Sequence, residues 1–443
     1  MKKIGFVSLG CAKNLTDTET MIGILNERGY TVTADASEAD VIVVNTCAFI
    51  DSAKEESINS ILEMAEYKNQ NCELLIVTGC LAQRYKSDIE AELCEVDVIL
   101  GTTEYEKIAD AVDAFYKNGD KLKIVSDENK AVDYDLPRVK TTPFYTAYLK
   151  IADGCDNFCT YCIIPKLRGK FKSRPKESII KEAEKLAKDG VKELILVAQD
   201  TAYYGMDQKD SNYFLNDLIK DLSKIDGIKW IRLQYCYPEN ISDALIDEIA
   251  NNNKVVKYLD MPLQHVSDNV LKKMGRKSRY DEICTLIKKL RKSINNLSIR
   301  TSLITGFPGE TEEDFEILKK FLAEYKLDKV GAFTYSREEG TPAYNYENQV
   351  DEAVKEARRD AIMLQQQDVL NQIHSEKIGT TCEVIIEGYD EDEFCYVGRS
   401  ESDTPDVDTI AYVYSNDELL AGDIVSIKIL DFDEYDMIGE CVL

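Results

Sequence analysis

Long apolar runs are missing from this chain of 443 residues. No stretch approaches the roughly 20 apolar residues that a membrane-spanning helix requires. The sequence begins Met1-Lys2-Lys3 and passes straight into a strand-like segment without a cleavage site, so we expect no secretory signal. Low-complexity tracts and clear internal repeats are missing too. The 13 cysteines are spread along the chain, which favours free thiols in a reducing cytoplasm over a disulfide framework.

Basic side chains are scarce. The sequence holds 54 Lys plus Arg against 81 Asp plus Glu, a formal net charge of -27 at pH 7. This balance opposes broad binding of a phosphate backbone and favours a basic partner. The last segment, residues 378–443, carries 18 acidic side chains against only Arg399 and Lys428. A solvated acidic surface that only keeps the protein soluble is the alternative explanation.

Histidine is scarce as well, with two residues in the chain, and neither lies near the C-x3-C-x2-C motif of Cys155, Cys159 and Cys162. A zinc knuckle, the alternative for this motif, pairs C-x2-C with a second Cys or His pair. Three thiolates on one loop can instead hold three corners of a cubic four-iron cluster. The fourth iron then has no protein ligand and is open for chemistry.

Three more cysteines follow strand-like runs in the first segment. Cys11 follows IGFVSLG, Cys47 follows DVIVVNT and Cys80 follows LLIVTG, with helical patterns between them. In a doubly wound parallel sheet the C-terminal strand ends share one edge, so these thiols can converge on a second cluster. The alternative is that each is a small buried core residue. The other cysteines show no such pattern and are predicted to be packing residues: Cys72, Cys94, Cys236, Cys284, Cys382, Cys395 and Cys441.

Three domains are predicted. Residues 1–125 alternate strands and helices, as in an α/β domain with a doubly wound parallel sheet. Residues 141–375 hold six strand candidates separated by helical patterns, which predicts an incomplete (βα)6 barrel with functional groups at the strand C-termini. Its lateral opening can admit a large substrate. Residues 378–443 hold five short strands and predict a small OB-like β-barrel. The single tryptophan, Trp230, is predicted to lie in the core.

Beyond these patterns, the cysteine motif with Tyr161 before its third cysteine resembles the signature of radical S-adenosylmethionine (AdoMet) enzymes. The whole chain is similar to the methylthiotransferase family, whose last domain is of the TRAM type. The ribosomal-protein branch is the nearer one, through four segments: SLGCAKNLTDTE at 8–19, PLQHVSDNVLKKMGR at 262–276, SREEGTPAY at 336–344 and DEYDMIGE at 433–440. Ala12 and Asp408-Thr409 depart from the Pro and Asp-Gly of that branch, which affects loop geometry rather than chemistry.

This resemblance implies a reaction. A cluster on the C-x3-C-x2-C loop reduces AdoMet to a deoxyadenosyl radical, which takes hydrogen from the β-carbon of an aspartate in small-subunit ribosomal protein S-twelve. Sulfur comes from a second cluster, and a separate AdoMet provides the methyl group. The implied ligands of the two 4Fe-4S clusters are Cys155, Cys159 and Cys162, and Cys11, Cys47 and Cys80. Further implied partners are a one-electron reductant and a sulfur donor in the cytoplasm, without a membrane or direct nucleic-acid contact.

Seven other residues are candidate cofactor contacts, and four of them have a plainer alternative. Asp200 ends the second barrel strand beside Gln199 and could instead cap a helix. His265 ends the fourth strand and could be a structural histidine. Gly306 lies in GFPGE, which could be a simple turn, and Arg337 could bind a carboxylate or merely lie on the surface. The full set is Tyr161, Gln199, Asp200, Gln264, His265, Gly306 and Arg337. No catalytic acid, base or nucleophile is predicted.

Competing functions make different predictions. A tRNA methylthiotransferase would grip RNA with its last domain, and the acidity of residues 378–443 opposes this. An iron-sulfur electron carrier explains the cysteines but gives no reason for a six-unit barrel or a third domain. A plain protein-binding module explains the acidic segment alone.

Overall fold

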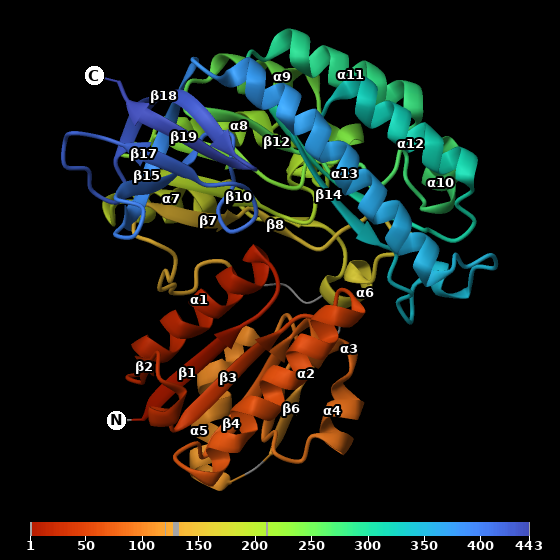
Figure 1. The fold of residues 1–443 in the computed structure, drawn as a ribbon. Helices are drawn as coiled ribbons and strands as arrows, with labels where there is room; N and C mark the ends of the chain where they lie inside the picture. The colour runs from red at the N-terminus through yellow and green to blue at the C-terminus, as the bar shows by residue number, and fades with distance from the viewer. Residues whose placement is uncertain (1, 120, 127–132, 210, 443) are drawn as a thin grey trace.

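The computed structural model of the chain describes residues 2–119, 121–126, 133–209 and 211–442. Two six-stranded sheets and a closed five-stranded barrel organise it, and a small two-stranded sheet accompanies them. Figure 1 shows the N-terminal sheet with its helices as a separate layer beneath the other two, which lie side by side. The predicted order of a parallel α/β sheet, an incomplete barrel and a small β-barrel is confirmed.

The first sheet is wholly parallel, in the order β2-β1-β3-β4-β5-β6. Its strands are β1 (Lys3–Ser8), β2 (Thr31–Thr33), β3 (Val41–Thr46), β4 (Leu74–Gly79), β5 (Val98–Leu100) and β6 (Leu122–Ile124). The central strands β3 and β4 are buried along their whole length, as expected for a sheet covered on both faces.

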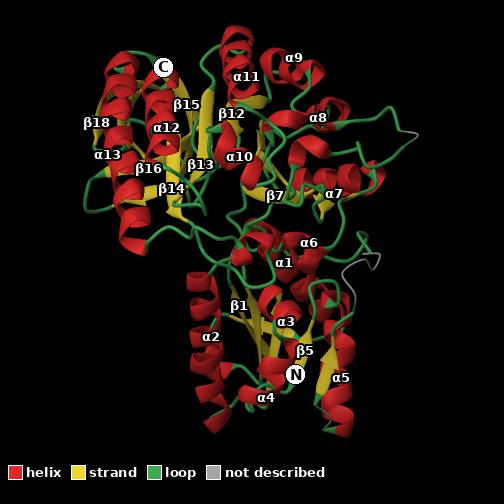
Figure 2. Cartoon of the chain, turned by 90° about the vertical axis from the view of Figure 1, so that its right-hand side faces the viewer, coloured by secondary structure: helices red, strands yellow, loops and turns green. Residues whose placement is uncertain are grey.

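Helices cover both faces of this sheet. They are α1 (Ala12–Glu27), α2 (Asp51–Ala65), α3 (Cys80–Arg84), α4 (Lys86–Glu92) and α5 (Ile108–Asn118). Apolar side chains of α1 and α5 pack on one face, and those of α2, α3 and α4 pack on the other. Figure 2 shows α2 and α5 on opposite sides of the strands. The arrangement is the predicted doubly wound sheet.

The second sheet is also wholly parallel and follows chain order, β14-β13-β12-β11-β10-β7. Its strands are β7 (Thr146–Lys150), β10 (Glu193–Val197), β11 (Trp230–Leu233), β12 (Val255–Asp260), β13 (Ser298–Thr305) and β14 (Lys329–Thr334). β7 and β14 are not paired with each other, so the sheet is an open six-stranded barrel. Before α7, the chain forms β8 (Ala152–Asp153), α6 (Ile164–Arg168) and β9 (Lys172–Ser173).

Amphipathic helices pack on the outside of this sheet and bury its apolar core. They are α7 (Lys176–Lys188), α8 (Leu215–Ser223), α9 (Asp243–Asn251), α10 (Asp268–Lys273), α11 (Tyr280–Ser293) and α12 (Glu312–Tyr325). The long α13 (Glu352–Lys377) packs against β14, β13 and α12 before the chain enters the last domain. Among the described helices, none has both the length and the apolar character needed to cross a bilayer.

The last domain is a closed barrel in the order β15-β16-β17-β19-β18. Its strands are β15 (Thr381–Asp390), β16 (Cys395–Ser400), β17 (Ala411–Tyr414), β18 (Ile424–Asp433) and β19 (Asp436–Cys441). β17 and β19 are parallel and the other pairs are antiparallel. Closure leaves no unpaired strand edge.

A buried charge cluster joins this small barrel to the second sheet. Glu193, at the start of β10, lies with its Oε1 atom 2.8 Å from Nε of Arg232 and with its Oε2 atom 2.5 Å from Nη2 of Arg399. All three side chains are almost inaccessible to solvent. Trp230 is buried nearby, as predicted, in an apolar cluster that includes Ile385 of β15. The last domain is therefore fixed to the barrel by buried charge and apolar packing.

One sequence prediction needs correction. Cys94 is exposed, so its assignment as a packing residue is wrong, because it follows the short helix α4 at the surface. Cys72, Cys236, Cys284 and Cys395 are buried as predicted, and Cys382 and Cys441 are partly buried.

Candidate functional site

The first cysteine trio lies at one edge of the N-terminal sheet. Cys11 follows β1, Cys47 follows β3 and Cys80 opens α3 directly after β4. Because these strands are parallel neighbours, their C-terminal ends bring the three thiols to the same edge. Gly10 lies close to Cys47, because a Cβ atom at Gly10 would lie 2.9 Å from Cβ of Cys47. The φ of 88° at Gly10 also suits glycine.

Asn14, on the first turn of α1, ties this edge together. Its Nδ2 atom donates hydrogen bonds to the carbonyl oxygens of Leu9, at 3.0 Å, and Thr46, at 2.9 Å. Those two residues lie in the segments that carry Cys11 and Cys47. The Oδ1 atom of Asn14 lies 4.0 Å from Sγ of Cys80. One side chain thus contacts the surroundings of all three cysteines.

The three thiols differ in their acidity. Burial opposes ionisation of Cys11, but the positive charges of Lys13 and Arg168 and two backbone N–H groups bring its pKa below the ordinary value. Burial raises the pKa of Cys80 to about 12, and it also raises the pKa of Cys47. Each thiol lies within electrostatic reach of another member of the trio. Ligation of iron by the trio would therefore release protons.

The second trio lies on the loop after β8. The backbone N–H of Cys155 donates to the carbonyl of Gly169 at 3.1 Å, and that of Cys162 donates to the carbonyl of Cys159 at 3.0 Å, which folds the loop tightly. Cys155 and Cys159 are buried, whereas Phe158 between them is exposed and has a φ of 48°. The loop therefore turns its thiols inward.

Two residues outside the loop contact Cys159: Tyr237, which follows β11, and Arg276, which follows α10. Nη1 of Arg276 lies 3.8 Å and the hydroxyl of Tyr237 lies 4.0 Å from Sγ of Cys159. The guanidinium of Arg276 also stacks over the ring of Tyr237, 4.1 Å from its centroid. Burial raises the pKa of Cys155 to about 11 and raises that of Cys162 as well. The cationic Arg276 favours thiolate character on the loop.

Among the residues that the structure describes, several buried polar atoms around this loop have no hydrogen-bond partner. They are the hydroxyl of Tyr161, Oε1 of Gln199, Oγ1 of Thr201 and Nε of Arg276. Buried polar groups are normally paired, so these atoms are available to a polar ligand. In the described part of the chain no group of three or more Cys, His, Asp or Glu side chains surrounds a single metal ion. A cubic cluster takes one thiolate on each of three irons, so its ligands need not converge on a single ion.

Asp200 and Gln199, the predicted pair after β10, make hydrogen bonds to the cysteine loop and to the strand before it. Asp200 is buried and accepts hydrogen bonds from Nδ2 of Asn157, at 3.0 Å, and Nδ2 of Asn240, at 2.6 Å. Burial raises its pKa to about 6. The side chain makes no helix-cap hydrogen bond, so the capping alternative is wrong. Gln199 donates from Nε2 to Oδ1 of Asp153 at 2.8 Å.

Gln264 and His265, the predicted pair after β12, lie within the packed part of the barrel. Gln264 has a φ of 69° and bonds to strand β13 through its N–H and carbonyl groups. His265 is fully buried, and its Nδ1 atom accepts the N–H of Ser267 at 2.9 Å. Its Nε2 atom has no partner, and burial lowers the pKa of the imidazole to about 4, so the ring is neutral at pH 7.

The last two predicted residues have other surroundings. Gly306 has a φ of 72°, and a Cβ atom there would lie 2.1 Å from Cγ of Lys355 on α13. Its N–H donates to Glu310 of the same GFPGE turn at 2.5 Å. Arg337 is exposed, donates from Nε to the carbonyl of Tyr344 at 2.8 Å and stacks on that ring. Neither contacts either cysteine trio in the described structure.

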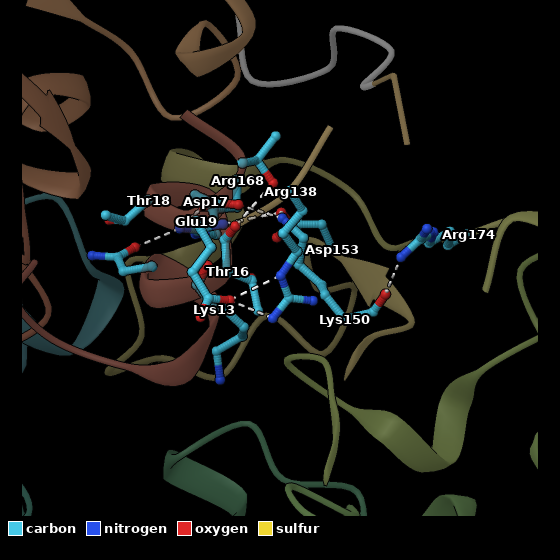
Figure 3. Close-up of polar contacts among 12 residues, drawn as sticks. Lys13, Thr16, Asp17, Thr18, Glu19, Arg138, Lys150, Asp153, Arg168 and Arg174 are labelled. Atoms are coloured by element: carbon cyan, nitrogen blue, oxygen red, sulfur yellow. Dashed lines mark hydrogen bonds and ion pairs between the residues drawn. The ribbon is translucent and has the colours of Figure 1, made fainter. Parts of the chain in front are cut away.

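A buried charge cluster at the seam between the first two domains was missed by the sequence analysis (Figure 3). Arg168 of α6 donates to Oδ1 of Asn14 at 2.6 Å, to Asp17 at 3.0 Å and to Asp153 at 3.0 Å. Lys150 also pairs with Asp17 and lies 3.4 Å from Asp153. The signal was the polar sequence of α1, whose buried residues include Lys13, Asn14, Thr16, Asp17, Thr18 and Glu19.

Known proteins resemble the chain in all three parts. Residues 3–101 match the Uncharacterized protein family UPF0004, residues 149–322 the Radical SAM superfamily and residues 378–442 the TRAM domain. Ribosomal protein uS12 methylthiotransferase RimO of Clostridium botulinum strain Hall is 51% identical over 438 residues, which are 99% of this chain and 97% of that protein. The protein of the same name from Acetivibrio thermocellus is 49% identical over 447 residues, 100% of this chain and 98% of that protein.

Among solved structures, the radical S-adenosylmethionine methyltransferase TsrM from Kitasatospora setae, with cobalamin and a 4Fe-4S cluster bound, aligns with a TM-score of 0.59. The alignment covers 77% of this chain and 74% of TsrM at 13% identity, so the likeness is one of fold alone. The two whole-length relatives, by contrast, share about half of their residues with this sequence across all three domains. The chain belongs to the RimO family of ribosomal protein uS12 methylthiotransferases.

Proposed function

We propose that this protein is a radical AdoMet methylthiotransferase that inserts sulfur and adds a methyl group at the β-carbon of an aspartate of ribosomal protein uS12. The observation that carries the proposal is the presence of two cysteine trios at facing domain edges, joined by the cluster of Arg168, Asp17 and Asp153. The whole-length similarity to the RimO proteins supports the same reaction and substrate.

Each trio would hold one 4Fe-4S cluster. Cys155, Cys159 and Cys162 would leave one iron open to AdoMet, and Cys11, Cys47 and Cys80 would hold the second cluster. When bound, these groups supply the one-electron cleavage of AdoMet and the sulfur that replaces hydrogen on an unactivated carbon. No side-chain base could remove that hydrogen as a proton, so the reaction at this carbon does not depend on a general base.

The chain's own residues would position and shield these groups. Asp200 fixes Asn157 within the cysteine loop, and Arg276 and Tyr237 cover Cys159. Tyr161, Gln199 and His265 each present an unpaired buried polar atom and are proposed as cofactor contacts. Gln264, Asp200, Gly306 and Arg337 also remain proposed contacts, and the first three of these would act by shaping the strand ends and the turn beside AdoMet.

The proposal also includes further partners, the cellular location and the limits of the three domains. A one-electron reductant and a sulfur donor would complete the reaction in the cytoplasm, without a membrane or direct nucleic-acid binding. The acidic last domain would recognise the basic ribosomal protein through complementary charge. We propose domain limits of 1–125, 141–375 and 378–443.

Anaerobically reconstituted protein, incubated with AdoMet, a reductant and a sulfur source, tests the function. We expect mass spectrometry to find a methylthio group on one aspartate of uS12 and no modification of tRNA in a parallel reaction. Modification of tRNA adenosine with unmodified uS12 would replace the proposal with the tRNA methylthiotransferase alternative. Production of deoxyadenosine without modification of either substrate would contradict both.

A further inference from the structure

Lys13 is a buried cation whose ammonium has no hydrogen-bonded partner in the described part of the chain, and the charges of Cys11 and Asp153 act on it without an ion pair. Its side chain is 8% exposed, and in the described part of the chain its Nζ atom makes no hydrogen bond or ion pair. It lies instead over the ring of Tyr235, 3.6 Å from the centroid. Figure 3 draws no contact to its ammonium, although the neighbouring charged residues are densely paired.

The nearby carboxylates are already engaged. Asp17 pairs with Lys150 and Arg168, and Asp153 pairs with Arg168 and accepts hydrogen bonds from Gln199 and the backbone of Gly154. Asp260, at the end of β12, pairs with Arg300 at 3.1 Å. These acids therefore have cations of their own. A contact with an aromatic face does not replace the hydrogen bonds that an ammonium loses when it leaves water, so the three N–H groups of Lys13 are available to an anionic acceptor.

The position of Lys13 is between the two cysteine trios. Its backbone is two residues after Cys11, at the edge of the first sheet. Its ammonium reaches Tyr235, which follows β11 at the C-terminal end of the barrel and has a φ of 60°. The side chain therefore crosses the seam from the first domain to the barrel end. A carbon atom that reacts with groups held by both trios must come to this region.

We propose that Lys13 binds the side-chain carboxylate of the target aspartate and thereby selects an acidic residue as the substrate. This inference rests on the proposed function. The carboxylate is attached to the β-carbon that reacts, so an ion pair at this group fixes the reacting carbon within one bond. A charged, desolvated hydrogen bond supplies both affinity and orientation. An uncharged amide in the same place would make a weaker hydrogen bond with the ammonium than a carboxylate does.

Binding of intact uS12 to the reconstituted protein, measured by calorimetry without AdoMet, tests the inference. The second ligand is uS12 whose target aspartate is replaced by asparagine. Wild-type protein should bind the aspartate form about tenfold more tightly, the range of a hydrogen bond between charged groups. Lys13→Met should bind both forms equally, and Lys13→Arg, which keeps the charge, should retain a preference for aspartate.

Lys117→Met is the matched control, because Lys117 is an exposed lysine on α5, and it should behave as wild type. Iron content checks that each variant is folded and loaded, and Lys13→Gln serves if Lys13→Met fails that check. A full aspartate preference in Lys13→Met or Lys13→Gln would overturn the inference. So would equal binding of both ligands by wild-type protein that still methylthiolates uS12, which leaves the proposed function intact. Modification of tRNA alone would overturn both.

Discussion

Arg168 Nη2 and Asp17 Oδ2 lie 3.0 Å apart, and this ion pair joins two domains. Arg168 ends α6, the short helix that follows the second cysteine trio, and Asp17 lies on α1, the helix that follows Cys11. Both side chains are buried. The pair therefore fixes the edge of the N-terminal sheet against the end of the barrel, where the two trios face each other.

Replacing Arg168 with Met should destabilise the protein. The substitution leaves Asp17 and Asp153 buried with Lys150 as their remaining cation, and breaking such a buried pair costs about 3–5 kcal/mol. Denaturant unfolding measures the loss. Lys188→Met, at an exposed lysine of α7 in the same domain, should change stability by less than about 0.5 kcal/mol. Equal stability of Arg168→Met and wild type would show that the seam does not depend on this pair.

Glu193 should make stability depend on pH in the acid range. Burial opposes its ionisation, but Arg399 and Arg232 lower its pKa from 4.5 to about 2. As the pH falls, the unfolded chain takes up this proton before the folded chain does. The stabilisation by Glu193 is therefore complete above pH 4.5 and is lost as the pH falls toward 2.

Glu193→Gln tests this dependence. The variant leaves Arg232 and Arg399 buried without their carboxylate, and we expect a loss of about 3–5 kcal/mol at pH 7. The difference between wild type and variant should shrink between pH 4.5 and 2. Glu184→Gln on α7, at a carboxylate exposed to solvent, is the control. A difference that stays constant through this pH range would contradict the assigned role of the charge.

The acidic surface of the last domain should contribute to binding of uS12. Asp431, Asp433 and Glu434 are exposed at the β18–β19 turn, whereas Asp436 is partly buried and accepts the N–H of Ile410. Changing the first three to Asn or Gln should weaken binding, chiefly through a slower association rate.

The effect should diminish as salt screens charges over about 8 Å at physiological ionic strength. A triple variant of Glu55, Glu56 and Glu63, exposed on α2, controls for net charge alone. Equal association rates for the two triple variants would assign the acidic turn to solubility rather than recognition.

The architecture of the three domains could be predicted from the sequence, because local patterns indicate the strands and helices of each domain. Apolar runs ending at Cys11, Cys47 and Cys80 predict parallel strands, and parallel strands bring their ends to one edge whatever the details of packing. The C-x3-C-x2-C loop after the first barrel strand follows the same rule. These features need no knowledge of how the domains pack together.

The seam could not be predicted in the same way. Asn14 and Asp17 lie on a helix face that is buried against another domain, and their partner Arg168 is more than a hundred residues away in sequence. A polar helix face is normally expected to face solvent. Domain docking reverses that expectation here, and it also explains why Lys13 was overlooked. Arg337 shows the opposite case. Its motif predicted a cofactor contact, but its side chain lies on the surface against Tyr344.

The iron content of single-trio variants tests the central claim that each trio holds its own cluster. Reconstituted wild-type protein should carry about eight irons per chain, twice the content of one four-iron cluster. Cys155→Ala/Cys159→Ala/Cys162→Ala and Cys11→Ala/Cys47→Ala/Cys80→Ala should each retain about four. If the first variant, still folded, binds no iron, then Cys11, Cys47 and Cys80 are not cluster ligands and the account of two facing clusters is wrong.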